Sequence, residues 1–591
     1  MCFIFKYKLN PYNKILYITI MDIYCEDQFP HLINTNYVNQ HQYVMDEIGK
    51  FYFLSNRTSL DILQEKYIEL FRFIYKKMIV QKCEFLYYLI CLYKLIGYFR
   101  DIKYGHGERD ISYMMICVWY NYYPKMALYV FRLFVNNVND QEPLGCWSDV
   151  KYFCEFVNNS DILITSQKNE IIHYAISIML YQFDKDNYFW NDILSEYLRK
   201  RFGEHIDTIR PDARNYISNV AKWIPREKSK YGWLYDKIVK QWNIIHKPFL
   251  FENINTIDQY EKVMKFCKMN FRTMISKINK EIDTPQIKQC NQNWNNIEPQ
   301  KVTLLTMLKQ KSGFTKKRHH TNFTSDFFLN HFHIGESMIN ENKFKKTNIS
   351  IGTYVKQAVD LLKYKLTDNT LCKIEFLNHC WTKNVLNHFK NNETFSSFLP
   401  IVDISSSLDY KTKYNAIGMG ILICQLSKLK RLILIENNFI CLNIHIEKDF
   451  TDVIREIMPY FQHSVLLNIN RFIDYIFNGG AGELIKQSCS FVFLSNSENI
   501  LKNNDIFFEK YNKNIYWIFW NMGGDIDETF FDYQLNNESL YISGSSPTLF
   551  YYLNKNGRYP KKMSTYLFIG ELLNITRYSN LSLYLCKQLS N

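Results

Sequence analysis

The chain has 591 residues, and this length excludes a single hydrophobic core, so we expect about two to four domains. Hydrophobic residues make up 47% of the sequence and aromatic residues 17%, which is ample for packed interiors. The formal net charge is +13, from 71 Lys and Arg against 58 Asp and Glu. That excess is compatible with a polyanionic partner, but a generally lysine-rich proteome explains it equally well.

Fifteen cysteines are scattered singly along the chain, and no Cys-x-x-Cys pair occurs. A zinc ribbon and a thioredoxin-type motif are therefore excluded. Several cysteines, among them Cys91, Cys117 and Cys424, lie inside apolar helical runs. We expect buried free thiols in a reducing compartment.

The first twenty residues are apolar but interrupted, by Lys6, Lys8 and Pro11 among others. They are too interrupted for a signal peptide or a membrane span, and no later window offers about 18 uninterrupted apolar residues. We expect residues 1–45 to be an N-terminal extension of a soluble, cytoplasmic protein that has no membrane partner.

From residue 58 to about 290, apolar residues recur at spacings of three and four, the period of amphipathic helices. Asp110 is expected to cap one helix, and Pro124 suits the first turn of the next. Short helices with tight connections predict an α-solenoid or HEAT-like helical array over residues 46–390, although no fixed repeat period is visible. The clearest helical segments are residues 59–80, 83–99, 110–123 and 124–138.

Residues 300–350 are basic, rich in histidine and without clear periodicity. We expect a long loop or an insertion within the helical array, followed by a helix at 353–366. The spacing of the histidines fits no zinc pattern, so the sequence favours no metal there. These histidines are His319, His320, His331 and His333.

After residue 398, short apolar runs of β type alternate with helical segments. This alternation predicts an α/β domain with a doubly wound parallel sheet of Rossmann type over residues 396–591. Ligands of such sheets bind at the carboxyl ends of the strands, where Asp403 is expected. The expected strands are 398–405, 431–436, 439–446, 488–495, 515–521 and 539–545.

Eight stretches of the sequence carry a family resemblance, among them 144–153, 278–297, 491–497 and 515–521; four others show it in both halves of the chain. These four are "GYFRDIKYGHGERDISYMM" (97–115), "AKWIPREKSKYGWLYDKI" (221–238), "PIVDISSSL" (400–408) and "LYISGSSPTLFYYL" (540–553). The first two resemble the helical half of an uncharacterised family found in plants, fungi and giant viruses of the mimivirus type, and the last two resemble its von Willebrand A-like half. The resemblance implies an architecture similar to that of the Ro-type (TROVE) RNA-binding proteins, in which an A domain closes a helical ring.

The same resemblance implies a metal-ion-dependent adhesion site, in which oxygen ligands surround a divalent cation octahedrally. Asp403, Ser405 and Ser407 supply its first loop, but Ile469 stands where the family has Thr and Asn496 where it has Asp. We therefore expect a degenerate site with no cofactor and a structural role for the loop. The alternative is weak Mg²⁺ binding at these residues.

Residues 97–110 include two glycines around His106 and several charged side chains. The segment lacks the preceding strand that a nucleotide-binding glycine loop needs. One interpretation is a tight turn between helices, fixed by pairing of Arg100 with Asp101 and of Glu108 with Arg109. The other is that cations of this segment contact phosphates on the inner face of the array; these are Arg100, Lys103 and Arg109.

Residues 221–233 interleave basic side chains with Trp223, Tyr231 and Trp233. Charge beside aromatic platforms suits single-stranded RNA, because backbone attraction and base stacking combine. The alternative is a helix end with a solvated basic loop and two core tryptophans. Basic clusters at 199–201 and 316–318 strengthen the nucleic-acid interpretation. The cations expected to contact RNA in these segments are Lys222, Arg226, Lys228, Lys230, Lys316, Lys317 and Arg318.

No catalytic set is recognisable, because the sequence lacks a serine nucleophile elbow, a His-Glu-x-x-His pair and a deaminase signature. We therefore expect a non-enzymatic scaffold that binds RNA or a ribonucleoprotein, located in the host cytoplasm or in the virus particle if the chain is viral. The alternative is a protein–protein interaction module without nucleic-acid binding. A third hypothesis, a metal-dependent hydrolase, depends on Asp403 alone.

Overall fold

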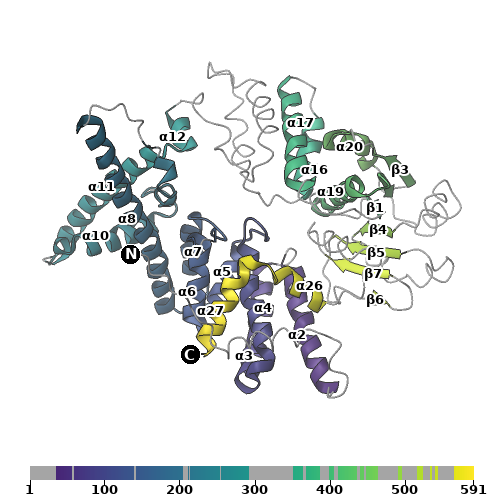
Figure 1. Ribbon diagram of the computed structural model, residues 1–591, viewed down its shortest axis with the longest axis horizontal. Coiled ribbons are helices and arrows are strands. Elements are labelled where there is room, and N and C mark those ends of the chain that lie inside the picture. Colours follow the sequence, from purple (N-terminus) through teal and green to yellow (C-terminus); the bar gives the residue numbers. More distant parts are fainter. Residues whose placement is uncertain are drawn as a thin grey trace.

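A computed structural model of the chain comprises an array of helices and one β-sheet (Figure 1). The histidine-rich loop at 300–350 lies outside the residues that it describes, as do residues 1–34 of the predicted extension. The described residues are 35–55, 59–138, 141–203, 211, 213–252, 254–291, 351–363, 368–386, 398–404, 410–435, 439–444, 448–462, 490–495, 516–522, 533–534, 539–543 and 565–590.

The N-terminal part is helical, as predicted. Pro124 lies in the first turn of its helix, but Asp110 is the first helical residue rather than the cap, which is Arg109. The longer helices are α2 (Thr35–Leu54), α3 (Leu60–Val80), α4 (Lys82–Arg100), α5 (Asp110–Tyr122), α6 (Pro124–Val135), α7 (Ser148–Asn159), α8 (Thr165–Gly203), α10 (Gly232–His246) and α11 (Ile257–Ile282). Shorter helical turns are η1 (Ala213–Asn215), α9 (Val220–Trp223), η2 (Pro248–Phe251) and α12 (Pro285–Cys290).

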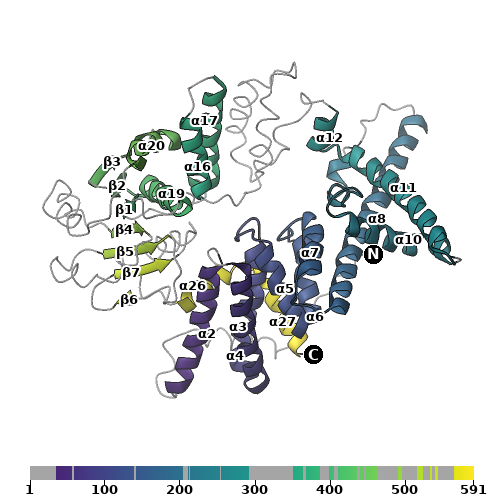
Figure 2. The ribbon, with the colours of Figure 1, turned by 180° about the vertical axis from the view of Figure 1, so that it is seen from behind.

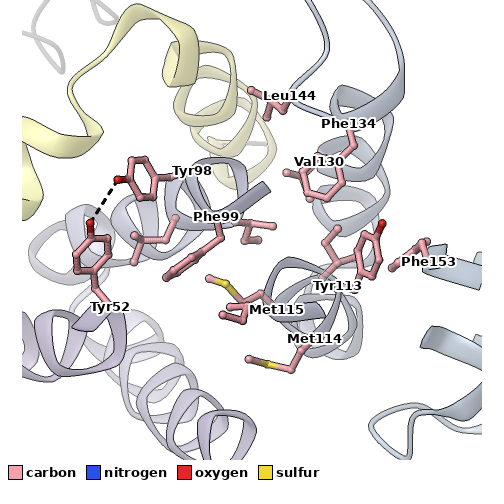
Figure 3. Close-up of a cluster of buried hydrophobic side chains, with 14 of the residues drawn as sticks. Tyr52, Tyr98, Phe99, Tyr113, Met114, Met115, Val130, Phe134, Leu144 and Phe153 are labelled. Carbon is pink, nitrogen blue, oxygen red and sulfur yellow. Dashed lines mark hydrogen bonds between the residues drawn. The ribbon is translucent and has the colours of Figure 1, made fainter. Parts of the chain in front are cut away.

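Aromatic side chains fill the centre of this array (Figure 3). Tyr52 of α2 and Tyr98 of α4 are both buried, and their hydroxyls are hydrogen-bonded at 3.3 Å. Trp119 of α5 is fully buried and donates a 2.8 Å hydrogen bond to the hydroxyl of Tyr67 on α3. These four side chains thus contribute large apolar surfaces while their polar atoms keep partners.

Two helices that precede the sheet pack on helices of the C-terminal half rather than on the N-terminal array. They are α16 (Ile351–Leu362) and α17 (Asp368–Trp381), which contact α19 (Tyr410–Leu426) and α20 (Phe450–Ile457); η5 (Thr382–Leu386) follows α17. A Cβ atom on Gly418 would lie 2.0 Å from a methyl carbon of Ile351, so the close approach of α16 and α19 requires glycine there. These helices fall within the range predicted for the helical array, yet their contacts are with the C-terminal half.

The C-terminal half contains one seven-stranded sheet, ordered β3-β2-β1-β4-β5-β7-β6. Strand β1 lies inside the sheet and pairs in parallel with β2 and β4. All six residues of β1 are buried, which is typical of a strand covered on both faces. The strands are β1 (Phe398–Asp403), β2 (Arg431–Ile435), β3 (Phe439–Asn443), β4 (Ser490–Ser495), β5 (Tyr516–Asn521), β6 (Tyr533–Gln534) and β7 (Ser539–Ser543).

The sheet is mixed: the predicted parallel arrangement is confirmed for β2, β1, β4, β5 and β7, but not for the two edge strands. Strand β3 runs antiparallel to β2, and β6 runs antiparallel to β7. Only residues 436–438 separate β2 from β3, and only 535–538 separate β6 from β7. Connections this short form hairpins, whereas a parallel crossover needs about a dozen residues or more.

The end of the chain returns to the N-terminal helices (Figures 1 and 2). Helix α26 (Thr565–Leu573) contacts α2 and α4, and after η7 (Thr576–Tyr578) helix α27 (Ser579–Ser590) contacts α4 and α6. Tyr584 stacks on Tyr129 with a centroid separation of 3.7 Å, and Lys82 donates to the carbonyl of Leu589 at 2.6 Å. The range 396–591, predicted as one A-like domain, therefore includes two helices that belong to the packing of the array.

Cys91, Cys117 and Cys424 are buried free thiols, as predicted. Burial raises the pKa of Cys91 to about 11 and that of Cys424 to about 12, so both stay protonated at neutral pH. Within the described ranges, no helix is long and apolar enough to span a bilayer.

Candidate nucleic-acid interface

The glycine-containing segment 101–109 is a turn between α4 and α5, as the first interpretation predicted. It folds back on α4, and the backbone N–H of His106 donates to the carbonyl of Tyr98 at 3.2 Å. A Cβ atom on Gly105 would lie 1.8 Å from that same carbonyl oxygen, and Gly107 has a φ of 70°. Both glycines are needed for this backbone path.

Arg100 is an internal structural residue, and the prediction that it contacts phosphates was wrong. Its side chain is 1% exposed and forms a bidentate ion pair with the fully buried Asp149, at 2.8 Å from Nε and 2.7 Å from Nη2. Asp149 also accepts from the Tyr113 hydroxyl and from the backbone N–H of Cys146. Burial alone would lower the pKa of Arg100, but the charge of Asp149 and its hydrogen bonds outweigh this and raise it.

Asp101 also has a partner that local sequence did not indicate. It is fully buried and accepts hydrogen bonds from Arg577 Nε at 2.6 Å and from the Tyr578 hydroxyl at 3.0 Å. The expected Arg100–Asp101 pairing is therefore replaced by two separate long-range interactions. Lys103 forms a 2.5 Å surface ion pair with Glu142, so its charge already has an acidic partner.

Arg109 lies at the surface beside the buried Arg100–Asp149 pair, not paired with Glu108 as expected. Its side chain is 39% exposed, and its Nη2 donates to Ser148 Oγ at 3.2 Å. Its Nε lies 3.5 Å from Asp149, and its guanidinium carbon lies 4.4 Å from the ring centroid of Tyr152. The turn and the first residues of α7 thus hold this cation in place.

Lys151, in the first turn of α7, joins Arg109 to the basic segment 221–233. Its ammonium lies 4.9 Å from the ring of Trp223, 5.0 Å from that of Tyr152 and 5.5 Å from that of Tyr231. Sequence reasoning did not select Lys151, because it is a single lysine in an ordinary amphipathic helix. Only the packing of α7 against the 221–233 segment brings it beside the other cations.

Two of the predicted cations complete this group. Lys230 lies 4.7 Å from the ring of Tyr231, and Lys222 lies 5.5 Å from that of Trp223. Arg226 and Lys228 are exposed on the same segment, and no ring contact of theirs is described. We name the assembled group the cation–aromatic cluster; it consists of Arg109, Lys151, Lys222, Lys230, Tyr152, Trp223 and Tyr231.

Within the cluster, like charges act on Lys151. Burial lowers the pKa of Lys151, and the charges of Arg109 and Lys230 lower it further. Among the described residues, neither Lys151 nor Lys230 is ion-paired with a carboxylate. The single charge of Asp149 is shared between Arg100 and Arg109. An excess of positive charge therefore remains at this surface and favours an anion.

Three helices begin at the cation–aromatic cluster. Helix α5 follows Arg109, α7 has Lys151 in its first turn, and α10 follows Tyr231. Helix N-termini carry partial positive charge and unpaired N–H groups, so they add to the potential of the cations.

The third predicted basic cluster, Lys316, Lys317 and Arg318, lies outside the described residues. Its role in RNA binding stays a prediction.

The carboxyl ends of the parallel strands form a second polar region. Asp403 ends β1, is buried, and accepts a 2.6 Å hydrogen bond from Ser495 Oγ, the last residue of β4. Ser495 is in register with the buried Asn521 at the end of β5. One oxygen of Asp403 is thus already hydrogen-bonded within the sheet.

Of the predicted metal ligands, Asp403 lies within the described residues. Ser405, Ser407 and Asn496 lie outside the described residues, as does Ile469. Over the part of the chain that the structure describes, no three His, Cys, Asp or Glu side chains gather in a way that could hold a metal ion. Asp403 is the one carboxylate among the predicted ligands, so a Mg²⁺ ion at this position would have a single anionic ligand from that set.

Comparison with protein-family models finds no match. The chain is similar to the uncharacterised protein L728 of Acanthamoeba polyphaga mimivirus, with 21% identity over 334 residues. The aligned region is 56% of this chain and 50% of the relative, so the similarity spans about half of each protein. The chain thus has a distant giant-virus relative whose name assigns no activity.

Proposed function

We propose that this chain is a non-enzymatic scaffold that binds RNA through the cation–aromatic cluster. The observation that supports this most strongly is the convergence of Arg109, Lys151 and Lys230, from three separate segments, on one group of aromatic rings. Like charges repel, and among the described ion pairs these three cations have only a share in one carboxylate, that of Asp149, so an anion that binds them stabilises the group. A phosphate backbone supplies several such anions at fixed spacing.

We also propose that the sheet and its helices form a von Willebrand A-like domain. The strand order from β3 to β5 supports this, because it is the 3-2-1-4-5 order of doubly wound folds. The polar row at the carboxyl ends of β1, β4 and β5 occupies the edge where such folds bind ligands. A helical array combined with an A-like domain supports the similarity in architecture to Ro-type RNA-binding proteins.

The role that we propose for Asp403 is structural. Its hydrogen bond with Ser495 joins the ends of two neighbouring strands, β1 and β4.

RNA binding can be tested by fluorescence anisotropy with a short labelled single-stranded RNA. For single strands, the logarithm of affinity falls with the logarithm of salt concentration by about 0.7 per neutralised phosphate. A triple variant, Arg109→Gln with Lys151→Gln and Lys230→Gln, should therefore lower this slope by about 2. The matched control is Lys240→Gln, because Lys240 also lies over a ring, 5.4 Å from that of Tyr260, and Tyr260 is not part of the cation–aromatic cluster.

The proposal fails if the wild-type protein shows no salt-sensitive RNA binding, or if the triple variant and the control bind alike. The competing function is a protein–protein interaction module. Cross-linking in expressing or infected cells separates the two, since it recovers RNA in one case and protein alone in the other.

A further inference from the structure

The rings of the cation–aromatic cluster are already in contact with the chain's own cations. Tyr152 has Arg109 and Lys151 at 4.4 and 5.0 Å from its centroid. Trp223 has two lysine ammonium groups at 4.9 and 5.5 Å, and Tyr231 has two at 4.7 and 5.5 Å. All six distances are within the range of about 6 Å in which a cation is attracted to a ring.

The rings also contact each other in a way that limits stacking by a ligand. Tyr152 and Tyr231 meet edge to face, with centroids 5.9 Å apart and planes at 86°. The edge of one ring therefore occupies the face of the other. The arrangement is typical of rings that hold neighbouring groups in place rather than of open platforms.

Energetics distinguish the two ways in which RNA could bind here. A base that stacks on one of these rings gains about 1–3 kcal/mol, but it must displace a cation whose ring contact contributes about 0.5–2 kcal/mol. A phosphate oxygen can approach the same cations without displacing them. It also relieves the repulsion that Arg109 and Lys230 exert on Lys151.

Arg109 is the cation best held for this purpose. The hydroxyl of Ser148, the carboxylate of Asp149 and the ring of Tyr152 fix its guanidinium from three directions. A guanidinium fixed before binding loses little conformational entropy when it donates to phosphate oxygens.

We infer that the cation–aromatic cluster recognises the phosphate groups of RNA and not its bases, an inference that rests on the proposed RNA-binding function. The aromatic rings position the cations, and the cations contact the ligand. Binding at this site is then independent of base identity and is shared by any ligand with closely spaced phosphates.

The test compares single-stranded oligo(U) and oligo(A) with inorganic tripolyphosphate, using the full chain throughout. We expect equal affinity for the two RNAs and displacement of both by tripolyphosphate. Lys151→Gln should weaken RNA and tripolyphosphate alike, by about tenfold, which is the lower end of what a hydrogen bond to a charged group contributes. Lys240→Gln should change neither, and thermal melts should show that both variants remain folded.

The possible outcomes separate this inference from the proposed function. A strong preference for oligo(A), or RNA binding that tripolyphosphate does not displace, overturns phosphate recognition while RNA binding stands. Tripolyphosphate binding that Lys151→Gln weakens, without any RNA binding, supports phosphate recognition and refutes the proposed function. Failure of both ligands to bind refutes both.

Discussion

The buried ion pair between Arg100 and Asp149 makes the sharpest stability prediction. Replacing Asp149 with Asn keeps the size of the side chain but removes its charge. The carboxylate accepts four hydrogen bonds, two from Arg100 and one each from Tyr113 and Cys146. An amide has one oxygen with two lone pairs, so at least two of these buried donors lose their acceptor.

The magnitude follows from burial, because the two side chains are 1% and 0% exposed. Each buried unsatisfied donor costs about 1–3 kcal/mol, and breaking a buried pair costs about 3–5 kcal/mol. We therefore expect Asp149→Asn to lower the free energy of unfolding by about 3–5 kcal/mol. At about 2–4 °C per kcal/mol, the melting temperature of the helical array falls by about 6–20 °C.

Thermal and urea unfolding followed by circular dichroism measure this change. The matched control is Glu142→Gln, which breaks the surface pair with Lys103 at a carboxylate that is 62% exposed; it should cost less than about 1 kcal/mol. The double variant Arg100→Met with Asp149→Asn should lose less free energy of unfolding than the sum of the two single variants, because no buried guanidinium is left without a partner. The reasoning is refuted if Asp149→Asn and Glu142→Gln are equally stable.

Three further predictions concern the turn and the C-terminal helices. Burial lowers the pKa of His106 to about 4 from 6.5, so the ring stays neutral in the folded protein. The neutral ring therefore contributes about 3 kcal/mol to the free energy of unfolding above about pH 6.5, and this contribution is lost as the pH falls through about 4. In acid denaturation, the stability of His106→Phe should fall less steeply with decreasing pH than that of the wild type. Gly105→Ala should lower the free energy of unfolding by about 1–3 kcal/mol, because the new Cβ atom would clash with the carbonyl of Tyr98. Gly570→Ala is the control: its Cβ atom would come no closer than 3.5 Å to another residue, so it should be neutral or stabilising. Equal melting temperatures for the two variants would exclude the clash at Gly105. Arg577→Gln should cost about 2–4 kcal/mol and increase proteolysis of the C-terminal helices, and unchanged protection would contradict this.

Most helices and strands of this chain were predictable from local patterns. The strand at 398–403 is a continuous apolar run, and it is buried along its whole length. Helix α6 combines Pro124 with an apolar face at helical spacing. Such signals depend only on residues that are close in sequence, so they can be recognised without knowledge of the fold.

Interactions between distant residues were not predictable in the same way. Arg100 and Asp101 are adjacent and opposite in charge, so their mutual pairing was the simplest expectation. Instead, Arg100 pairs 49 residues away with Asp149, and Asp101 pairs 476 residues away with Arg577. Backbone direction at the end of α4 sends the two side chains to different helices, and no local pattern encodes those partners.

The candidate interface was predicted in part. Lys222 and Lys230 were selected from charge beside aromatic residues, and Arg109 from the charged glycine turn. The three do share one surface. Lys151, which links them, was missed because a lone lysine in a helix carries no signal. The aromatic rings that were expected to stack on bases are already in contact with the chain's own lysines. These contacts join separate segments, so only the three-dimensional structure reveals them.

The hydrogen bonds from Arg577 and Tyr578 to Asp101 have a consequence for synthesis. A ribosome adds about 5–20 residues per second, so Asp101 emerges roughly half a minute to a minute and a half before its partners. During that interval, the surface of α4 that α27 later covers is exposed on the nascent chain. The first helices to be synthesised are therefore among the last to acquire all of their packing contacts. A product terminated before residue 565 would lack α26 and α27, and the surface that they cover would stay exposed to quality-control factors.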